Sequence, residues 1–426
     1  MRELDVYLEI NSKLVLVGEI CGNSYEDACF TYNVEYIHSE IARAISNSLP
    51  LKIEPFSALE TKNYFEGLLP EGFSRRAVAN YVKVSEDDYL AILESLGREC
   101  LGALLIIKKG ESWDVGEYVR LSDDEVAKLA AEGATKSTKI LTETHLSLTG
   151  ASGKVGLYYD EKAQSWYLPK GIKASSHIVK QSHVRLERIV LNEYFCMNVA
   201  KKLGIDTPEI FIVNIGNGLD SEVLFATKRY DRKLSDDGSS MESLVSPMRL
   251  HQEDFCQALG IPASEKYEHG ERNYMKRMFE LIRRVSTNPL EDQLKLWDMI
   301  VVNYLMGNTD CHIKNYSLLY SENLKSVRLA PAYDIVCTMA YQTTRQMSFA
   351  IGGEFDITRI DRDSFVKAAR DVGLGSKIAM ERFDRLSEAF GNAVDEVATE
   401  LSENGYSGVD DLRKVMHRIY FARRKK

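Results

Sequence analysis

The feature that most constrains the fold is the stretch of residues 303–320, Asn-Tyr-Leu-Met-Gly-Asn-Thr-Asp-Cys-His-Ile-Lys-Asn-Tyr-Ser-Leu-Leu-Tyr. It places Asp310 five residues before Asn315, and a second aspartate, Asp334, follows beyond a short apolar segment that predicts a strand. One carboxylate can orient or accept the proton of an acceptor hydroxyl, while an amide and a second carboxylate hold Mg²⁺. Phosphoryl transfer from ATP needs these groups in that order. The chain must therefore fold so that the three side chains meet.

The Asp-x-x-x-x-Asn spacing matches the catalytic loop of protein kinases, and Tyr333–Ile335 stands where those enzymes carry Asp-Phe-Gly. Taken alone, Asp310 and Asn315 could equally be turn residues, because turns favour Asp and Asn for conformational reasons. The addition of Asp334, in the required order, favours the catalytic interpretation.

Three further residues of this region are assigned to the nucleotide site. His312 is expected to orient the loop by hydrogen bonding rather than to act as the base. Lys314 follows the aspartate closely enough to stabilise charge on the transferring phosphoryl group. Tyr333 directly precedes the second aspartate, Asp334, and is also assigned to the ATP-binding site.

Composition limits the class of protein. The chain has 426 residues, enough for two or three domains, and its net charge of −9 argues against broad non-specific nucleic-acid binding. Its seven cysteines are scattered and never form Cys-x-x-Cys, which predicts reduced thiols in a cytoplasm and neither a disulfide framework nor a zinc site. The N-terminus lacks the apolar core of a signal peptide, and no apolar run is long enough to predict a membrane span.

The distribution of strand and helix patterns predicts three segments. Residues 1–110 contain a hairpin over 4–20 and a buried strand over 102–107, and form an α+β module. Residues 111–245 are β-rich, with strands predicted at 155–159, 166–169, 177–180 and 210–213. They also contain one clear amphipathic helix over 186–203 that ends before a glycine. Residues 246–426 are mostly helical, with one helix predicted over Gln293–Met306. We expect an α+β, bilobal, protein-kinase-like fold with an N-terminal α+β subdomain, a helical C-terminal lobe and ATP in the cleft between the lobes.

Phosphate-binding candidates lie in the β-rich segment. Backbone N–H groups of a loop between two predicted strands could cradle phosphates, although a plain hairpin turn is an open alternative. The loop consists of Thr149, Gly150, Ala151, Ser152, Gly153 and Lys154. Lys180, at the end of a predicted strand, could reach the α- and β-phosphates with Glu193, or less favourably Glu187, as its anchor. The alternative for Lys180 is an ordinary solvated lysine.

The connection at residues 227–232 could supply the groups that read the adenine edge, from Lys228, Arg229 and Tyr230. Its charges could equally belong to a solvated linker. The acids at the start of the next segment, 249–260, are interpreted as a helix N-terminal turn with a structural role.

Together these pieces resemble the HipA family of toxin kinases from bacterial toxin–antitoxin operons, over almost the whole chain. The motifs that carry the resemblance are 64–72, 96–103, 146–151 with Lys154, 177–180, 192–194, 229–232, 252–257, 307–317 and 333–335.

The resemblance implies a serine/threonine protein kinase (EC 2.7.11.1) that uses ATP and Mg²⁺, with Asp310 as base and Asn315 and Asp334 as magnesium ligands. It also implies that Lys180 and the loop 149–154 hold the phosphates and that 228–230 forms the adenine hinge. Ser147 occupies the position of the serine that is autophosphorylated in the family. Because like charges repel, a phosphate on this serine cannot share the loop with the ATP phosphates, so the loop is ejected and the enzyme is silenced.

Family members typically bind a helix-turn-helix antitoxin of the HipB type, and some phosphorylate an aminoacyl-tRNA synthetase and halt translation. Operator DNA is expected to be reached mainly through the antitoxin, because the segment 352–356 is short and acidic. Two rival functions stay open: a small-molecule kinase of the aminoglycoside or choline type, and a catalytically silent corepressor that only binds an antitoxin.

Overall fold

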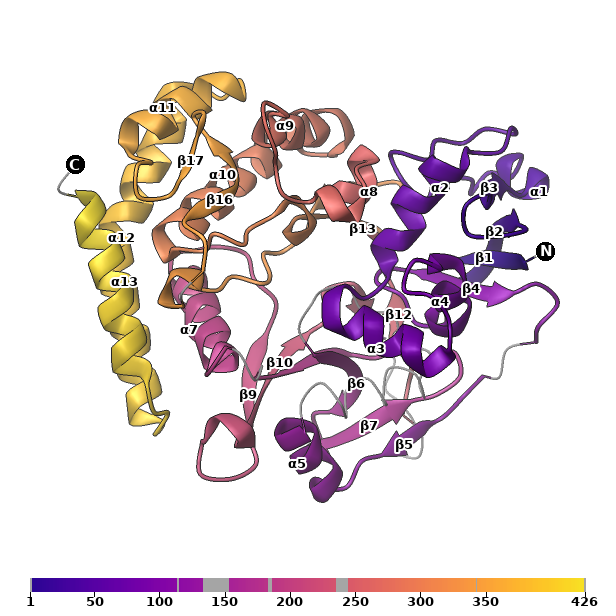
Figure 1. Cartoon of the computed structure of the whole chain (residues 1–426), viewed down its shortest axis with the longest axis horizontal. Coiled ribbons are helices and arrows are strands. Elements are labelled where there is room, and N and C mark those ends of the chain that lie inside the picture. The colour runs from indigo at the N-terminus through magenta and orange to yellow at the C-terminus, as the bar shows by residue number, and fades with distance from the viewer. Residues whose placement is uncertain are drawn as a thin grey trace. The chain divides into compact units, whose positions relative to one another are not determined.

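The computed structural model describes residues 2–112, 115–132, 153–182, 186–234, 244–341 and 343–424. The chain forms two compact units, each built from separate stretches of sequence (Figure 1). The first unit comprises Met1–Val184, Ala226–Ala263 and Leu318–Val327. The second comprises Arg185–Phe225, Ser264–Ser317 and Arg328–Lys426. The boundaries expected at residues 110 and 245 stay a prediction, because this division groups residues by packing.

A four-stranded antiparallel sheet in the order β3-β2-β1-β4 opens the first unit. Its strands are β1 (Arg2–Ile10), β2 (Lys13–Gly22), β3 (Cys29–Tyr32) and β4 (Leu104–Lys108). Every second residue of β1 is buried, so Leu4, Val6 and Leu8 face the core and the residues between them remain partly exposed. The predicted hairpin over 4–20 and the strand over 102–107 are confirmed.

Short helices pack beside this sheet. They are α1 (Val34–Ile37), α2 (Ala58–Phe65), α3 (Gly72–Val82) and α4 (Tyr89–Leu96). Helix α2 begins with a capping box in which Ser57 and Glu60 satisfy each other's backbone N–H groups. Helix α4 contacts β4 and buries Leu90, Ile92 and Leu93 completely. These helices place the hydrophobic core on one face of the sheet.

The first unit also contains most of a six-stranded sheet, in which the consecutive strands β5-β7-β6-β8-β10 are followed at the edge by β9 (Ile210–Asn214). Its other strands are β5 (Tyr118–Arg120), β6 (Lys154–Asp160), β7 (Ser165–Pro169), β8 (His177–Gln181) and β10 (Val223–Lys228), and helix α5 (Asp123–Glu132) follows β5 in the chain. β6 and β8 are antiparallel, and their register pairs Lys154 with Lys180. Strand β10 carries the chain from the second unit into the first. The strands predicted at 155–159, 166–169 and 177–180 are confirmed.

The remaining elements of this part are short. They are β11 (Arg232–Lys233), β12 (Met248–Arg249), β13 (Gln252–Asp254) and α8 (Phe255–Leu259). Strands β14 (Ser317–Tyr320) and β15 (Val327–Leu329) each contain residues of both units. The Asp254 side chain accepts the N–H of Gln257 at 2.9 Å and caps α8. The structural role predicted for the acids of this segment is confirmed at Asp254.

Five buried charged residues tie the N-terminal module to the rest of the first unit: Glu99, Arg229, Asp231, Arg232 and Arg249. The Glu99 carboxylate accepts hydrogen bonds from all three guanidinium groups, at 2.7 to 3.2 Å. Arg229 also forms a bidentate pair with Asp231. Burial alone would raise the pKa of Glu99, but the three guanidinium groups hold that pKa well below its usual range. The cluster therefore keeps its charges paired inside the unit.

The second unit is mainly helical. Its helices are α7 (Ile189–Lys202), α9 (Tyr274–Val285), α10 (Pro289–Met306), α11 (Arg362–Asp371), α12 (Ser376–Glu403) and α13 (Val409–Arg424). The helix predicted over 186–203 is α7, and Gly204 follows it with a φ of +83°. Helix α10 starts four residues before the predicted Gln293, because Pro289 at its first position is already set for a helix.

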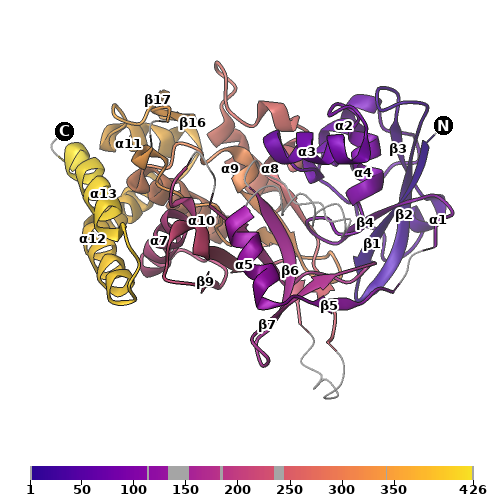
Figure 2. The ribbon, with the colours of Figure 1, turned by 60° about the horizontal axis from the view of Figure 1, so that its bottom comes forward.

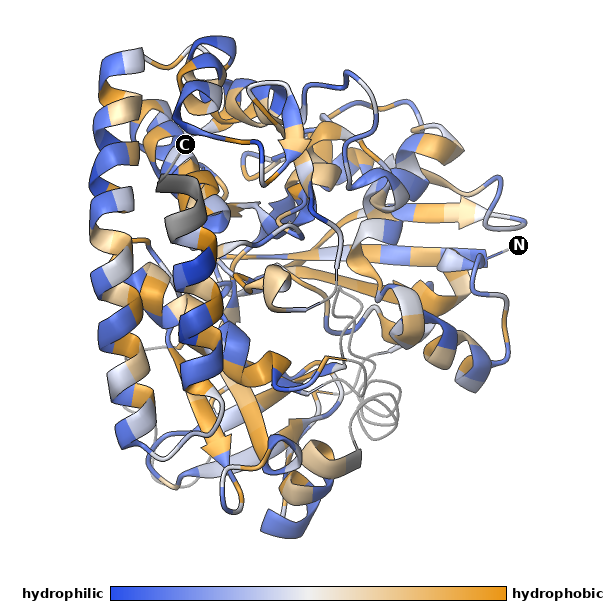
Figure 3. Ribbon diagram, turned by 60° about the vertical axis from the view of Figure 1, so that its left-hand side comes forward, coloured by the Kyte–Doolittle hydropathy of each residue, from blue (hydrophilic) through white to orange (hydrophobic). Residues whose placement is uncertain are grey.

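The two long C-terminal helices, α12 and α13, lie side by side (Figures 1 and 2). Hydrophobic and hydrophilic residues follow one another along α12 (Figure 3). The hydrophobic ones include Phe383, Phe390 and Val397, and all three are buried. These buried side chains fix α12 against its neighbours.

Three strands of the second unit complete the fold: β9 (Ile210–Asn214), β16 (Gln346–Ile351) and β17 (Glu354–Asp356). The sequence predicted β9 but not the β16–β17 hairpin, which lies in a stretch interpreted as mostly helical. Among the helices that the structure describes, none is both long and apolar enough to cross a lipid bilayer.

Candidate active site

The catalytic-loop candidate begins where helix α10 stops. Gly307 ends the helix with a φ of +77°, a left-handed conformation that favours glycine. The chain then forms a loop, a short 3₁₀ turn at Ile313–Asn315 and strand β14. Asp310 lies in that loop and is exposed, whereas Cys311 and Ile313 are buried. Asp310 is therefore exposed to solvent, while the buried residues beside it hold the loop in place.

Hydrogen bonds fix the backbone around Asp310. Its N–H donates to Oδ1 of Asn308 at 3.1 Å. Its carbonyl oxygen accepts from the N–H of His312 at 2.8 Å and from Nδ2 of Asn315 at 3.0 Å. The phenol of Tyr267 donates to Oδ1 of the Asp310 carboxylate at 2.6 Å.

The contact between Asn315 and Asp310 also orients the Asn315 amide. A carbonyl oxygen can only accept a hydrogen bond, so the group of Asn315 that faces it must be the NH₂. The amide oxygen is then left as the atom that could coordinate a cation.

Hydrogen bonds of Asn308 connect the backbone of Asp334 to the loop that carries Asp310. Nδ2 of Asn308 lies 3.4 Å from the carbonyl oxygen of Asp334 and donates to Oδ1 of Asn303 at 2.7 Å. Asp334 has a φ of +54°, an uncommon conformation for a residue with a side chain. Such strained residues persist where the surroundings hold them, often at functional sites. Asn308 is buried and lies within the motif 307–317, although no role was predicted for it, and it links the two aspartate-bearing segments.

The donor set of this region fits a magnesium ion. Mg²⁺ prefers hard oxygen ligands, which a carboxylate and an amide oxygen provide, and it retains waters and substrate phosphates as further ligands. Asn315 and Asp334 would hold such an ion, and the ion would screen charge on the phosphates. In the part of the chain that the structure describes, no three His, Cys, Asp or Glu side chains gather as a metal site.

The loop is also tied to the segment after Asp334. The N–H of Thr309 donates to Oγ1 of Thr338 at 2.8 Å, and Oγ1 of Thr338 donates to the carbonyl of Gly307 at 3.1 Å. Oγ of Ser348, on β16, donates to the carbonyl of Thr309 at 2.7 Å. These three hydroxyl residues were not predicted, because their partners become neighbours only in the folded chain.

Helix α7 is attached to the same segment through Asn192, which is fully buried. Its side chain accepts the N–H of Cys337 at 3.0 Å and donates to the Cys337 carbonyl at 3.1 Å. An amide that pairs with both groups of one backbone residue fixes the separation between a helix and a loop. Asn192 lies next to Glu193, the predicted anchor of Lys180, and that anchoring role stays a prediction.

The other predicted residues of this loop are buried. His312 and Lys314 are each 7% exposed. The Tyr333 hydroxyl lies 2.7 Å from Oγ of Ser317 and donates to the carbonyl of Lys314 at 2.9 Å. The hydroxyl of Tyr333 therefore supports the catalytic loop, and a nucleotide contact by Tyr333 stays a prediction.

In the first unit, the predicted phosphate-binding lysines stand opposite each other. Lys154 on β6 and Lys180 on β8 form a cross-strand pair and are 9% and 8% exposed. The solvated alternative for Lys180 is thus wrong. Gly153 is buried next to Lys154. Five predicted residues lie outside the described residues: Ser147, Thr149, Gly150, Ala151 and Ser152.

One residue of the predicted adenine hinge, Arg229, uses its side chain for contacts inside the first unit. The Arg229 guanidinium belongs to the buried cluster, and the backbone N–H of Arg229 donates to the carbonyl of Ser176 at 2.9 Å. Lys228 pairs with Glu161 at the surface at 3.2 Å. The hinge remains a prediction, and its adenine contacts would have to come from the backbone of Lys228 and Tyr230.

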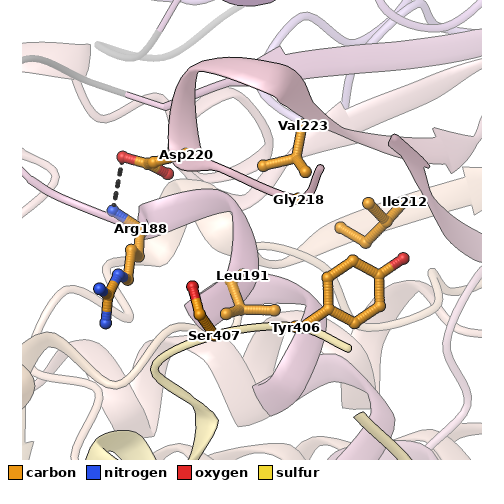
Figure 4. A pocket seen from close by; sticks show the side chains of 8 residues that line it. All are labelled: Arg188, Leu191, Ile212, Gly218, Asp220, Val223, Tyr406 and Ser407. Atoms are coloured by element: carbon orange, nitrogen blue, oxygen red, sulfur yellow. Dashed lines mark hydrogen bonds between the residues drawn. The ribbon is translucent and has the colours of Figure 1, made fainter. Parts of the chain in front are cut away.

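A small separate pocket lies in the second unit (Figure 4). It is lined by Arg188, Leu191, Ile212, Gly218, Asp220, Val223, Tyr406 and Ser407. The backbone N–H of Arg188 donates to the Asp220 carboxylate at 2.9 Å, and the Arg188 side chain points away from Asp220 (Figure 4). Asp310, Asn315 and Asp334 do not line this pocket.

Known proteins resemble this chain in sequence. A model of the HipA-like C-terminal domain matches residues 146–396, and a model of the HipA N-terminal domain matches residues 6–107. The putative kinase Y4mE of Sinorhizobium fredii is 32% identical over 398 residues, 91% of each chain. The serine/threonine-protein kinase toxin HipA of Shewanella oneidensis is 25% identical, over 92% of this chain and 89% of that protein.

A solved structure shares the fold. The Shewanella oneidensis complex of HipA, HipB and operator DNA contains a chain that aligns with a TM-score of 0.80 and 23% identity, covering 98% of this chain and 96% of that one. The α+β fold class expected from the sequence is thereby confirmed. Because its N-terminal and C-terminal domain models both match and a relative 32% identical covers nine-tenths of it, this chain belongs to the HipA family.

Proposed function

We propose that this protein is an ATP- and Mg²⁺-dependent serine/threonine protein kinase that acts as the toxin of a toxin–antitoxin pair. The observation that carries the proposal is the linkage of Asp310, Asn315 and Asp334 through hydrogen bonds made by Asn308 and Asn315. Phosphoryl transfer needs these side-chain types in one place. The names of the relatives from Sinorhizobium fredii and Shewanella oneidensis support the same reaction class.

In this proposal the oxygen of the acceptor hydroxyl forms a bond to the γ-phosphorus of ATP, and the bond between that phosphorus and ADP breaks. Asp310 accepts the proton that the hydroxyl loses. Its exposed position suits that role, because a protein substrate must reach the carboxylate. Asn315 and Asp334 hold the magnesium ion, and buried Lys314 supplies positive charge close to the reacting phosphoryl group.

Lys154 and Lys180 bind phosphate oxygens of ATP, aided by the backbone of residues 149–153. Two lysines that pair across neighbouring strands and have little exposure would favour a multiply charged anion. Ser147 is the proposed site of autophosphorylation. A phosphate there would repel the ATP phosphates from the same loop and silence the enzyme.

The proposed partner is a helix-turn-helix antitoxin of the HipB type, through which operator DNA would be reached. The solved complex from Shewanella oneidensis brings together HipA, HipB and operator DNA, and this supports the assignment. The proposed target is a cytoplasmic protein such as an aminoacyl-tRNA synthetase, whose phosphorylation would inhibit translation.

Incubation of the purified protein with radiolabelled ATP tests the reaction. The wild type should label itself, and Asp310→Asn should abolish labelling because an amide cannot accept the proton. A matched control is Asp384→Asn on α12, whose exposed carboxylate pairs with exposed Arg362. Labelling that survives Asp310→Asn would refute the assignment of the base. Phosphorylation of small alcohols and of no protein would favour the small-molecule kinase instead.

A further inference from the structure

The contact between Tyr267 and Asp310 has no part in the function proposed above. Tyr267 lies in the loop between the 3₁₀ turn η3 (Ala263–Glu265) and helix α9, and is 36% exposed. Its hydroxyl donates to Oδ1 of Asp310 at 2.6 Å, across 43 residues of sequence. Both residues belong to the second unit. The shortness of the contact is typical of a hydrogen bond from a hydroxyl to a carboxylate.

The loop that carries Tyr267 is held by its neighbour Glu268, which is 7% exposed. The Glu268 carboxylate accepts the N–H of Ala350 at 3.0 Å and the N–H of Tyr274 at 3.3 Å. Its own N–H donates to the carbonyl of Ser348 at 2.8 Å. The backbone of Tyr267 is therefore fixed to strand β16 and to the start of α9.

The same strand holds the other side of the contact. Oγ of Ser348 donates to the carbonyl of Thr309, the residue directly before Asp310. The ring of Tyr267 also meets the ring of His312 edge to face, with centroids 5.3 Å apart and planes at 83°. Two loops that are far apart in sequence are thus set against one strand, so that phenol and carboxylate meet without a long flexible connection.

We propose that Tyr267 is a positioning residue for the base Asp310. A hydrogen bond at Oδ1 restricts rotation of the carboxylate and leaves proton acceptance to Oδ2. An exposed aspartate without such a contact samples several orientations, and only some of them point at an acceptor hydroxyl. This inference rests on the proposed function, because it assigns Tyr267 a role only through Asp310.

Two other roles for the same contact give different results. If Tyr267 occupied the place of the acceptor and blocked it, removal of its hydroxyl would raise activity. If Tyr267 were itself the acceptor, its oxygen would receive the phosphoryl group while Asp310 took its proton, and phosphotyrosine would form. The extensive anchoring of the loop favours positioning, because a blocking or accepting residue must leave the site again.

The test compares Tyr267→Phe with Tyr81→Phe, a control at a 58%-exposed tyrosine on α3. The rate of self-labelling is measured as a function of ATP concentration. Tyr267→Phe should lower the maximal rate roughly tenfold, as expected for a misoriented base, and leave the half-saturating ATP concentration unchanged. Tyr267→Ala should lose the same factor if the hydroxyl is what matters, and thermal melting confirms that each variant is folded.

Different outcomes distinguish the role of Tyr267 from the proposed function. An unchanged or higher rate in folded Tyr267→Phe, or phosphotyrosine at 267 by mass spectrometry, would overturn positioning while leaving the kinase assignment in place. A wild type that transfers no label, or an active Asp310→Asn, would overturn both.

Discussion

Lys154 and Lys180 stand directly opposite each other on antiparallel strands β6 and β8, and each is less than a tenth exposed. The proposed function assigns both lysines to the phosphate groups of ATP, where a multiply charged anion would meet two positive charges.

The first prediction concerns this pair. Lys180→Met and Lys154→Met should each weaken binding of Mg²⁺-ATP roughly 10- to 100-fold, since each removes a hydrogen bond between charged groups. Isothermal titration calorimetry measures the affinity. Lys162→Met, at an exposed lysine beyond β6, serves as the control and should bind as the wild type does. Equal affinity in all four proteins would contradict a phosphate site at β6 and β8.

The second prediction separates the roles of the two aspartates. Asp310→Asn should bind Mg²⁺-ATP with nearly wild-type affinity while transferring no phosphate, because the base does not hold the metal. Asp334→Asn should require roughly 10- to 100-fold more Mg²⁺ for half-maximal nucleotide binding, because it removes a charged ligand. Magnesium titrations at fixed ATP measure both variants. If the two variants show the same magnesium dependence, the division of roles is wrong.

The third prediction tests the buried cluster of Glu99, Arg229, Asp231, Arg232 and Arg249. Arg229→Met leaves Glu99 and Asp231 short of a partner, and loss of one member of a buried pair costs about 3–5 kcal/mol. Arg362→Met breaks an exposed pair with Asp384 and should cost less than about 1 kcal/mol.

Hydrogen exchange of strands β4 and β8 reports on the cluster, because both strands belong to the first unit that it holds together. Protection should fall in Arg229→Met and stay in the control. Equal protection in the two variants would show that the cluster contributes little to stability.

The fourth prediction concerns Glu253, a buried carboxyl that accepts hydrogen bonds from Ser46, Tyr320 and the N–H of Asn47. Burial raises the pKa of Glu253 from 4.5 to about 7. Between these values the folded state keeps the proton and the unfolded state has lost it. The contribution of Glu253 to stability therefore falls as the pH rises from 4.5 to 7, by up to about 3 kcal/mol.

Glu253→Gln removes this titration, so its stability relative to the wild type should increase across the same interval in urea unfolding. Nearby His251 acts in the opposite direction, because burial lowers its pKa from 6.5 to about 4 and its contribution is lost as the pH falls. The difference between variant and wild type cancels the His251 effect. A difference that is constant from pH 4.5 to 7 would contradict the raised pKa of Glu253.

Much of the local structure and the order of the catalytic side chains follow from the sequence alone. The hairpin of β1 and β2, helix α7 with Gly204 behind it and the spacing of Asp310 and Asn315 depend on residues within a few positions of each other. Periodicity, capping and turn formation act over that range. Helix α10 and the hairpin β16–β17 show the limit, since a proline start extended the one and a long loop-rich stretch concealed the other.

What holds these residues in place was decided only by the tertiary structure. Asn192 meets Cys337 across 145 residues, and Arg229 meets Glu99 across 130. No local pattern selects such partners, because a buried polar group takes whichever donor or acceptor the packing of distant segments brings to it. The candidate catalytic residues can therefore be identified from local sequence motifs. Their orientation, burial and hydrogen-bond partners depend on the folded chain.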